Sequence, residues 1–216
     1  MLMAARSYAE YVAMFDLEEL PPSILDCSAG GSSFTAEANR RGVRTVEAVP
    51  AYSVPDGDLS IALRNAAQET RRINDDHADD FVWTWYGPPA RRDLLRAEAA
   101  EDLLVDKVRH PERYVAAALP NLPFAPGHFD MVLCSHLLFA RSDQYGLDWH
   151  VAAARELLRV CSGQVRIFPL LGRGTGRPVE FLAEFLYRLN VPWAIRDVPY
   201  ELPRGANQML VLKKLL

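Results

Sequence analysis

Five short apolar runs, several of them separated by segments with helical periodicity, constrain the fold of this chain more than any other feature. They are the ranges 24–28, 43–49, 129–135, 163–171 and 208–215. Strands that alternate with helices are typical of a mostly parallel sheet covered by helices on both faces. The chain has 216 residues, half of them hydrophobic, which is enough to build the core of one such domain. We therefore predict an α/β protein.

Helices can be placed between some of these runs. Residues 32–42 extend from serines suited to cap a helix to Gly42, which is suited to end one, so 24–49 is predicted to form a β-α-β unit. Apolar residues recur at helical spacing over 147–160, which predicts a helix with one buried face. A further helix is predicted over 179–190.

The C-terminal part of the chain has a different pattern. Two strand-like runs, 192–202 and 208–215, are joined by the turn-forming sequence PRGAN. A short polar turn between two such runs is typical of a hairpin. We therefore expect the last two strands to be antiparallel.

The interval between the second and third apolar runs, about eighty residues, is too long for a simple connection. It contains helical-looking segments at 59–74 and 90–109, separated by an aromatic run at 81–87. Ligands of open α/β sheets bind beyond the carboxyl ends of the strands, where this insertion begins. We predict a helical cap over 51–112 that belongs to a single domain, 1–216.

Charge and composition limit the partners. The 24 basic and 28 acidic residues give a net charge of −4 without a long run of one sign, which favours a small-molecule ligand over nucleic acid or a membrane surface. With no apolar stretch long enough to span a bilayer and no signal-like N-terminus, we expect a cytoplasmic protein. The oligomeric state is left open. The five histidines lack metal-ligand spacing, so we predict no metal, and we expect three buried thiols, at Cys27, Cys134 and Cys161.

The sharpest local motif is ILDCSAGGSSF, residues 24–34. An apolar strand ends at Asp26, and small residues then lead directly into a helix, as close approach of a ligand to the backbone requires. Ordinary packing also accounts for a turn of small residues. The motif resembles motif I of the class I S-adenosylmethionine-dependent methyltransferases, usually Asp/Glu-x-Gly-x-Gly-x-Gly. Asp26 and Gly30 match it, whereas Ser28 and Ser32 stand where the family has glycine.

Later segments resemble the same family in the same order. Residues 114–139 are similar to the stretch in which "LPF" and "FD-V" lead into strand four, and 150–171 to the following "ELLRVL-PGG" helix and strand five. Residues 199–214 fit the last two strands. The pattern resembles an uncharacterised bacterial branch of the family. The resemblance covers nearly the whole chain apart from the cap. It implies a Rossmann-like, mostly parallel seven-stranded sheet with helices on both faces and a C-terminal antiparallel hairpin, and the cap predicted above is inserted after strand two.

The resemblance also implies S-adenosylmethionine as cofactor, bound at the positions that correspond to the family's site, namely Asp26, Ser28, Gly30, Ser32, Val49, Leu119 and Ser135. Two departures concern acids that bind the ribose and the adenine in this family. Val49 stands near the position of the ribose-binding acid, and Glu47 lies deeper in the strand. Ala118 and Leu119 stand near the position of the adenine-binding acid. Losing a charge-assisted hydrogen bond costs roughly 1 to 3 kcal/mol. Either the cap, the main chain or Tyr52 replaces these bonds, or the cofactor is not bound in the family's way.

Histidine is the residue type best suited to proton transfer near neutral pH. His136 directly follows a strand at the ligand end of the sheet, so it is the first candidate for a catalytic base. Alternatively, its ring is held by backbone groups at the start of a helix. His150 with Asp148 is a second candidate, with exposure to solvent as the alternative.

Candidate substrate-binding residues come from the cap and the final turn. Trp85 and Tyr86 are predicted to form an aromatic wall, or else the core of the cap. Arg72 is predicted to orient a carboxylate together with Arg71, or else to lie on a solvated helix face. Asn207 lies in a polar group in the last hairpin, either at the substrate mouth or simply in a surface turn.

The leading hypothesis is methyl transfer to a small molecule by in-line displacement under the cap. The missing acids leave two alternatives. One is another reaction on the same fold, and the other is a non-catalytic binding protein that has lost the usual cofactor contacts. The sequence lacks the Gly-x-Ser-x-Gly, P-loop and Gly-x-Gly-x-x-Gly motifs, which argues against hydrolase, kinase-like and dehydrogenase functions.

Overall fold

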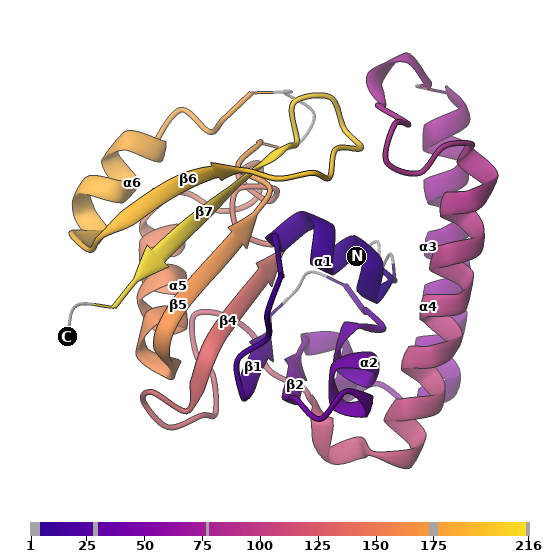
Figure 1. Ribbon diagram of the computed structural model, residues 1–216, viewed down its shortest axis with the longest axis horizontal. Coiled ribbons are helices and arrows are strands. Elements are labelled where there is room, and N and C mark those ends of the chain that lie inside the picture. The colour runs from indigo at the N-terminus through magenta and orange to yellow at the C-terminus, as the bar shows by residue number, and fades with distance from the viewer. Residues whose placement is uncertain (1–4, 28–29, 77, 173–176, 215–216) are drawn as a thin grey trace.

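The computed structural model describes residues 5–27, 30–76, 78–172 and 177–214 (Figure 1). Within them, one seven-stranded sheet has the order β3-β2-β1-β4-β5-β7-β6. The strands pair in parallel from β3 to β5, and β7 is antiparallel to both β5 and β6. Their bounds are β1 Ser23–Asp26, β2 Arg44–Ala48, β3 Tyr114–Val115, β4 Phe129–Ser135, β5 Cys161–Phe168, β6 Trp193–Asp197 and β7 Gln208–Lys213.

Six α-helices accompany this sheet in the described ranges. They are α1 Tyr8–Phe15, α2 Phe34–Arg40, α3 Asp56–Asp76, α4 Pro89–Arg109, α5 Leu147–Val160 and α6 Leu182–Leu189. The helix α5 has the bounds expected from its apolar spacing. After α2 the chain turns at Gly42, whose φ of +84° is a conformation that favours glycine. Three short 3₁₀ helices complete the elements, at Pro50–Ser53, Ala78–Asp80 and Pro111–Arg113.

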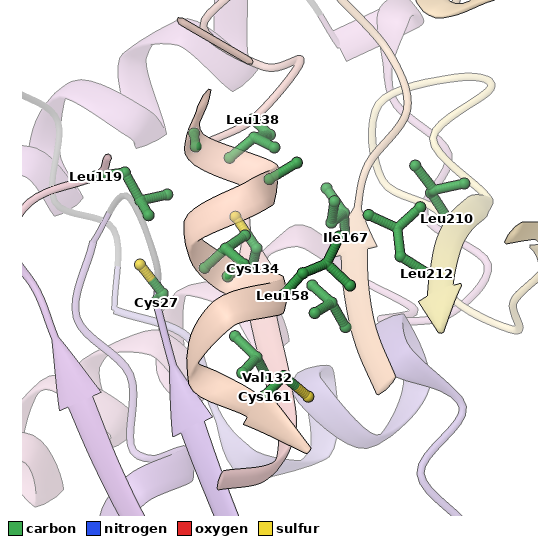
Figure 2. Packing of buried hydrophobic residues seen from close by; sticks show 14 of the residues in the cluster. Cys27, Leu119, Val132, Cys134, Leu138, Leu158, Cys161, Ile167, Leu210 and Leu212 are labelled. Carbon is green, nitrogen blue, oxygen red and sulfur yellow. The ribbon is translucent and has the colours of Figure 1, made fainter. Parts of the chain in front are cut away.

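The two faces of the sheet carry separate hydrophobic cores. Leu25 and Val132 face α5 and α6, in the cluster of Figure 2 that also contains all three cysteines. Their strand neighbours Ile24 and Met131 pack with α1 and α2 on the opposite face. Successive residues of a strand point to opposite faces, so each apolar run supplies both cores. The structure confirms the predicted fold class, a Rossmann-like seven-stranded sheet with helices on both faces and a C-terminal antiparallel hairpin.

The helix α1 has no counterpart among the predicted elements. It begins at a capping box in which the Ser7 hydroxyl accepts a hydrogen bond from the backbone N–H of Glu10, and the Glu10 carboxylate accepts one from the backbone N–H of Ser7. Just before it, Arg6 pairs with Ser32 in a short parallel bridge. The N-terminal segment is thereby fixed beside the loop that follows β1.

The helices α3 and α4 lie side by side between β2 and β3 in the sequence, at the side of the molecule remote from α6 (Figure 1). Leu59 and Leu63 of α3 and Leu103 of α4 pack against Val49. A Cβ atom on Gly31 would lie 2.4 Å from Cδ2 of Leu103, so α4 approaches the loop after β1 closely. Among the described residues, no helix combines the length and the apolar character needed to cross a membrane.

Candidate functional site

The candidate site lies where the parallel strands β1, β2 and β4 end at one edge of the sheet. Asp26 ends β1 and Ser135 ends β4, while Val49 follows β2 directly. Of the predicted loop residues, Gly30 and Ser32 are buried, and Ser28 lies outside the described residues. The sheet therefore brings the predicted residues Asp26, Val49 and Ser135 to the same edge.

Asp26 is fully buried, and both of its carboxyl oxygens are engaged. Oδ1 accepts a hydrogen bond from the Tyr11 hydroxyl at 3.1 Å, and Oδ2 accepts one from the Ser32 hydroxyl at 2.9 Å. Burial raises the pKa of Asp26 to about 7, against the opposing effects of these two hydrogen bonds and of the nearby Arg6. The carboxyl group thus joins α1 to the loop after β1.

The positions at which the family's two acids were sought are apolar in this structure. Val49 is buried beneath the leucines of α3 and α4, and Leu119 lies in the core on the α5 face. Tyr52, considered as a replacement, packs edge-on against Tyr114 with 5.4 Å between ring centroids. Burial and then the Glu47 carboxylate raise the pKa of Tyr52. The side chains of Val49 and Leu119 cannot form hydrogen bonds. Their role in cofactor binding stays a prediction.

His136 follows β4 in an unusual backbone conformation, with φ at +54°. Its Nδ1 lies 2.9 Å from the Ser135 hydroxyl, and its ring packs edge-on against Phe168. Burial, followed by the positive charges of Arg6 and Arg96, lowers the pKa of His136 well below its usual value of 6.5. The imidazole is therefore neutral at neutral pH, and its Nε2 makes no hydrogen bond with the described part of the chain.

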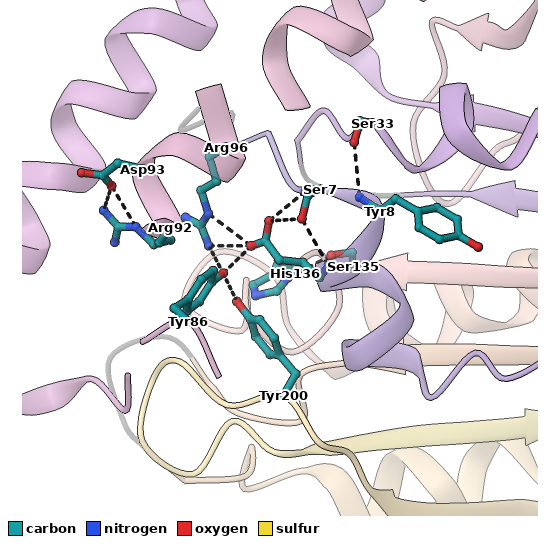
Figure 3. A network of polar contacts seen from close by, with 11 residues as sticks. Ser7, Tyr8, Ser33, Tyr86, Arg92, Asp93, Arg96, Ser135, His136 and Tyr200 are labelled. Carbon is teal, nitrogen blue, oxygen red and sulfur yellow. Dashed lines mark hydrogen bonds and ion pairs between the residues drawn. The ribbon is translucent and has the colours of Figure 1, made fainter. Parts of the chain in front are cut away.

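A buried polar network connects α1, α4 and the C-terminal segment (Figure 3). The Glu10 carboxylate accepts hydrogen bonds from the Tyr86 hydroxyl and, at 3.3 Å, from Nε of Arg96. The Tyr86 hydroxyl also lies 2.8 Å from that of Tyr200. Trp85 packs against the rings of Tyr86 and Tyr200, with centroids 4.7 and 5.3 Å away. Tyr86 and Trp85, both predicted to bind substrate, are thus packed against the C-terminal segment.

The other two predicted substrate residues lie apart. Arg72 is exposed on α3, forms an ion pair with Glu69 at 2.9 Å and lines a cavity between α3 and α4. Asn207 lies just before β7 and lines a different cavity, next to Trp85. The structure therefore does not bring Arg72 and Asn207 together, and a substrate role for either stays a prediction.

His150 was expected to be exposed to solvent if it is not catalytic, but it is fully buried in α5. Its Nδ1 lies 2.9 Å from the carbonyl of Gly146, and Nε2 accepts a hydrogen bond from the backbone N–H of Phe139 at 3.2 Å. Asp148 forms an ion pair with Arg188 at 2.8 Å. The expectation of exposure was wrong for His150, since its position in α5 belongs to the apolar face.

Several residues of the site escaped the sequence analysis, namely Arg6, Glu10, Tyr11, Arg96 and Tyr200. The pattern Ser7-x-x-Glu10 is a capping-box signature that predicts the start of α1, and it would have placed Glu10 and Tyr11 on a helix. Tyr200 meets Tyr86 across 114 residues of sequence, and no local pattern indicates that contact.

Comparisons with known proteins bear on the fold. No family model matches the chain. The uncharacterised protein MJ0045 of Methanocaldococcus jannaschii is 25% identical over 216 residues, which cover 99% of this chain and 96% of that protein. The magnesium protoporphyrin IX methyltransferase of Synechocystis, solved with bound S-adenosylmethionine, has a TM-score of 0.49 at 13% identity, covering 96% of this chain and 78% of that one.

A TehB-like S-adenosylmethionine-dependent methyltransferase from Corynebacterium glutamicum superposes with a TM-score of 0.51 at 14% identity, covering 95% of this chain and 88% of that one. This chain has the class I methyltransferase fold. On the methyltransferase fold found here, Asp26, Ser32, Ser135 and His136 gather at the carboxyl edge of the sheet. Arg6 lies close enough to affect the pKa of both Asp26 and His136.

Proposed function

We propose that this protein transfers a methyl group from S-adenosylmethionine to a small molecule. The fold shared with an S-adenosylmethionine-dependent methyltransferase supports this function. The observation that carries it is the grouping at the carboxyl edge of the sheet, where a loop with small residues, an arginine and a neutral imidazole meet. In open α/β folds this edge is where ligands bind.

The methionine end of the cofactor fits the described residues. It carries a carboxylate, and Arg6 supplies a guanidinium whose Nε is buried without a hydrogen-bond partner among the described residues. An arginine donates readily to a carboxylate, and such charge-assisted bonds are stronger than neutral ones. Beside Arg6, the loop after β1 carries Gly30 and Ser32, both buried, which we propose to contact the ligand. Ser28 completes the proposed set of loop residues.

The adenosine end would rest on main-chain and apolar contacts. Val49 and Leu119 offer no carboxylate to the ribose or the adenine. Each charge-assisted hydrogen bond to such a group is worth roughly 1.5 to 3 kcal/mol, so we expect weaker binding than at a site with both acids, by about two to four orders of magnitude.

S-adenosylmethionine supplies an already activated methyl group, so the chain's own residues have to position the acceptor, exclude water and receive a proton. Positioning contributes roughly 7 to 11 kcal/mol in favourable systems. The helices α3 and α4 pack against Val49 and the loop after β1, and we propose that they exclude water. Nε2 of the neutral His136 is the proposed acceptor of the proton that leaves the substrate, while Ser135 orients the ring through Nδ1.

Calorimetric titration of S-adenosylhomocysteine into wild type and Arg6→Gln tests this proposal. We expect saturable binding to wild type and about 10- to 100-fold weaker binding to Arg6→Gln, because a charged partner of the ligand carboxylate is lost. Arg109→Gln is the matched control, since Arg109 is exposed in the last turn of α4 and should leave the affinity unchanged. Equal affinities in wild type and Arg6→Gln would remove Arg6 from the site.

A specific observation favours a second candidate function, that of a non-catalytic binding protein. Tyr11 and Ser32 occupy both oxygens of Asp26, and apolar residues stand at the two acid positions. Such a protein would bind a small molecule without binding S-adenosylhomocysteine, so the same titration separates the two functions.

A further inference from the structure

A cavity lies between α3 and α4, and none of the described residues proposed to bind the cofactor lines it. Its volume is about 750 Å³, which falls in the range of about 300 to 1,000 Å³ typical of small-molecule sites. Both helices contribute apolar side chains to its wall, among them Leu63, Ala67, Ala100 and Leu104, and Ala5 reaches it from the N-terminal segment. The cavity is therefore large and apolar enough to hold the body of a small organic molecule.

The same wall carries an excess of positive charge. Five arginines line the cavity, Arg64, Arg71, Arg72, Arg92 and Arg96, against two acidic residues, Asp93 and Glu101. One carboxylate serves two of the arginines, because Asp93 accepts from Nε of Arg71 at 2.8 Å and from Nε of Arg92 at 3.0 Å. Arg72 pairs with Glu69 and Arg96 with Glu10, both outside the wall, which leaves Arg64 as the one of the five with no ion pair among the described residues.

Arg92 is the most informative of these residues. It is 2% exposed, and its Nη1 is buried without a hydrogen-bond partner among the described residues. The face of the guanidinium packs at 5.5 Å from the ring centroid of Trp83, which contributes no acceptor in the plane of the group. Leaving a buried donor of a charged group unpaired is costly, so the arrangement favours an acceptor supplied by a ligand.

We propose that this cavity binds the carboxylate or phosphate group of an otherwise apolar small molecule and, resting on the proposed function, that this molecule is the methyl acceptor. Arg92 binds the anionic group, while the apolar wall holds the rest. Two oxygens on one group suit the forked donors of arginine. Arg64 lies on the α3 side of the wall and is exposed.

Side-chain contacts link the cavity wall to the carboxyl edge of the sheet. Arg96 lines the cavity and also donates to Glu10 and, at 3.3 Å, to the Tyr86 hydroxyl of the buried network (Figure 3). The charge of Arg96 contributes to the lowered pKa of His136. Ala5, at the cavity wall, directly precedes Arg6. Arg96 and the Ala5–Arg6 segment therefore join the cavity wall to the residues proposed for methyl transfer.

Titration calorimetry with three matched probes tests the anion site without the cofactor. Benzoate tests for a carboxylate ligand, phenyl phosphate for a phosphate ligand, and benzamide is the uncharged control. We expect saturable binding of at least one of the two anions at millimolar concentrations, with the tighter one indicating the ligand class, and no saturation by benzamide. Saturation by none of the probes, or equal binding of benzamide, would overturn the proposal.

Two variants locate the binding independently. Arg92→Met should weaken binding of the anion by about 10- to 100-fold, because charge-assisted hydrogen bonds are lost. Ala100→Phe fills the cavity without changing the charge and should abolish saturation, which keeps the test valid if Arg92→Met does not fold. Arg109→Gln changes the charge of α4 outside the cavity and should bind as wild type. Unchanged binding in Ala100→Phe would place the anion elsewhere and contradict the proposal.

A parallel titration with S-adenosylhomocysteine distinguishes failure of this proposal from failure of the proposed function. If wild type binds S-adenosylhomocysteine but neither anion, the anion site alone is wrong. If it binds an anion in the cavity but no S-adenosylhomocysteine, the anion site stands and the assignment of its ligand as methyl acceptor is wrong.

Discussion

At the scale of single residues, burial at the carboxyl edge of the sheet shifts the pKa values of Asp26 and His136 in opposite directions. Burial raises the pKa of Asp26 to about 7, because a buried carboxyl group resists ionisation. Burial and two arginines lower the pKa of His136, because a buried imidazole resists protonation. Burial therefore favours the neutral form of both groups. The pKa shift of each group leads to its own prediction about pH dependence.

The folded pKa of Asp26 lies above the unfolded value of 3.8, so the folded state binds more protons between about pH 4 and pH 7. The stability that Asp26 contributes is therefore present at low pH and is lost as the pH rises through this window. We expect the free energy of unfolding of wild type, relative to Asp26→Asn, to fall by about 1.4 kcal/mol per pH unit there. Urea unfolding at several pH values measures it, and a constant difference would refute the shifted pKa.

The pKa of His136 depends on Arg6, so Arg6→Gln should move it upward toward 6.5. Wild-type His136 stays neutral as the pH falls to 6.5 and protonates only below it, and any activity that uses its Nε2 is lost in that lower range. An NMR titration of the ring protons, assigned with His136→Gln, measures both values. An identical pKa in wild type and Arg6→Gln would contradict the proximity of the two side chains, and Arg109→Gln controls for net charge.

At the scale of elements, α1 holds the site together although it is only eight residues long. It supplies Glu10 to the buried network and Tyr11 to Asp26. A helix this short has little stability of its own, so its cap and its packing determine whether it forms. The start of α1 is therefore a sensitive point of the structure.

Ser7→Ala removes the capping hydroxyl of α1, and we expect it to lower the free energy of unfolding by about 0.5 to 2 kcal/mol. Ser7→Thr keeps the hydroxyl and should restore most of the loss, while Ser142→Ala serves as a control with no side-chain hydrogen bond among the described residues. Chemical denaturation provides the measurement. If Ser7→Ala were as stable as wild type, the capping box would have no part in fixing α1.

Elements differ in how far sequence predicts them. The range 147–160 was predicted at its observed bounds because its apolar stripe is long and regular. The helix α6 begins at Leu182, three residues later than expected, since helix starts without a side-chain cap carry little signal. The strand β3 has two residues, too few for any pattern, and only the family resemblance implied that a seventh strand exists.

At the scale of the whole molecule, the net charge does not show how the charges are distributed. A value of −4 favours a small ligand over nucleic acid, yet it conceals five arginines around one cavity. Arg92 and Arg96 are four residues apart on α4, and Arg64 and Arg71 are seven apart on α3, so each pair shares a helix face. That spacing was visible in the sequence. What sequence could not show was that the two faces are opposed, because their helices meet only in the folded cap.

The carboxyl edge of this methyltransferase-fold sheet is proposed to bind S-adenosylmethionine, although Val49 and Leu119 stand where the family has acids. Equilibrium titration of the wild-type protein with S-adenosylhomocysteine, followed by heat and by the shift in melting temperature, tests it most directly. We predict saturable binding at one site per chain, together with a rise in melting temperature. The absence of both heat and thermal shift at millimolar ligand would contradict cofactor binding at this edge.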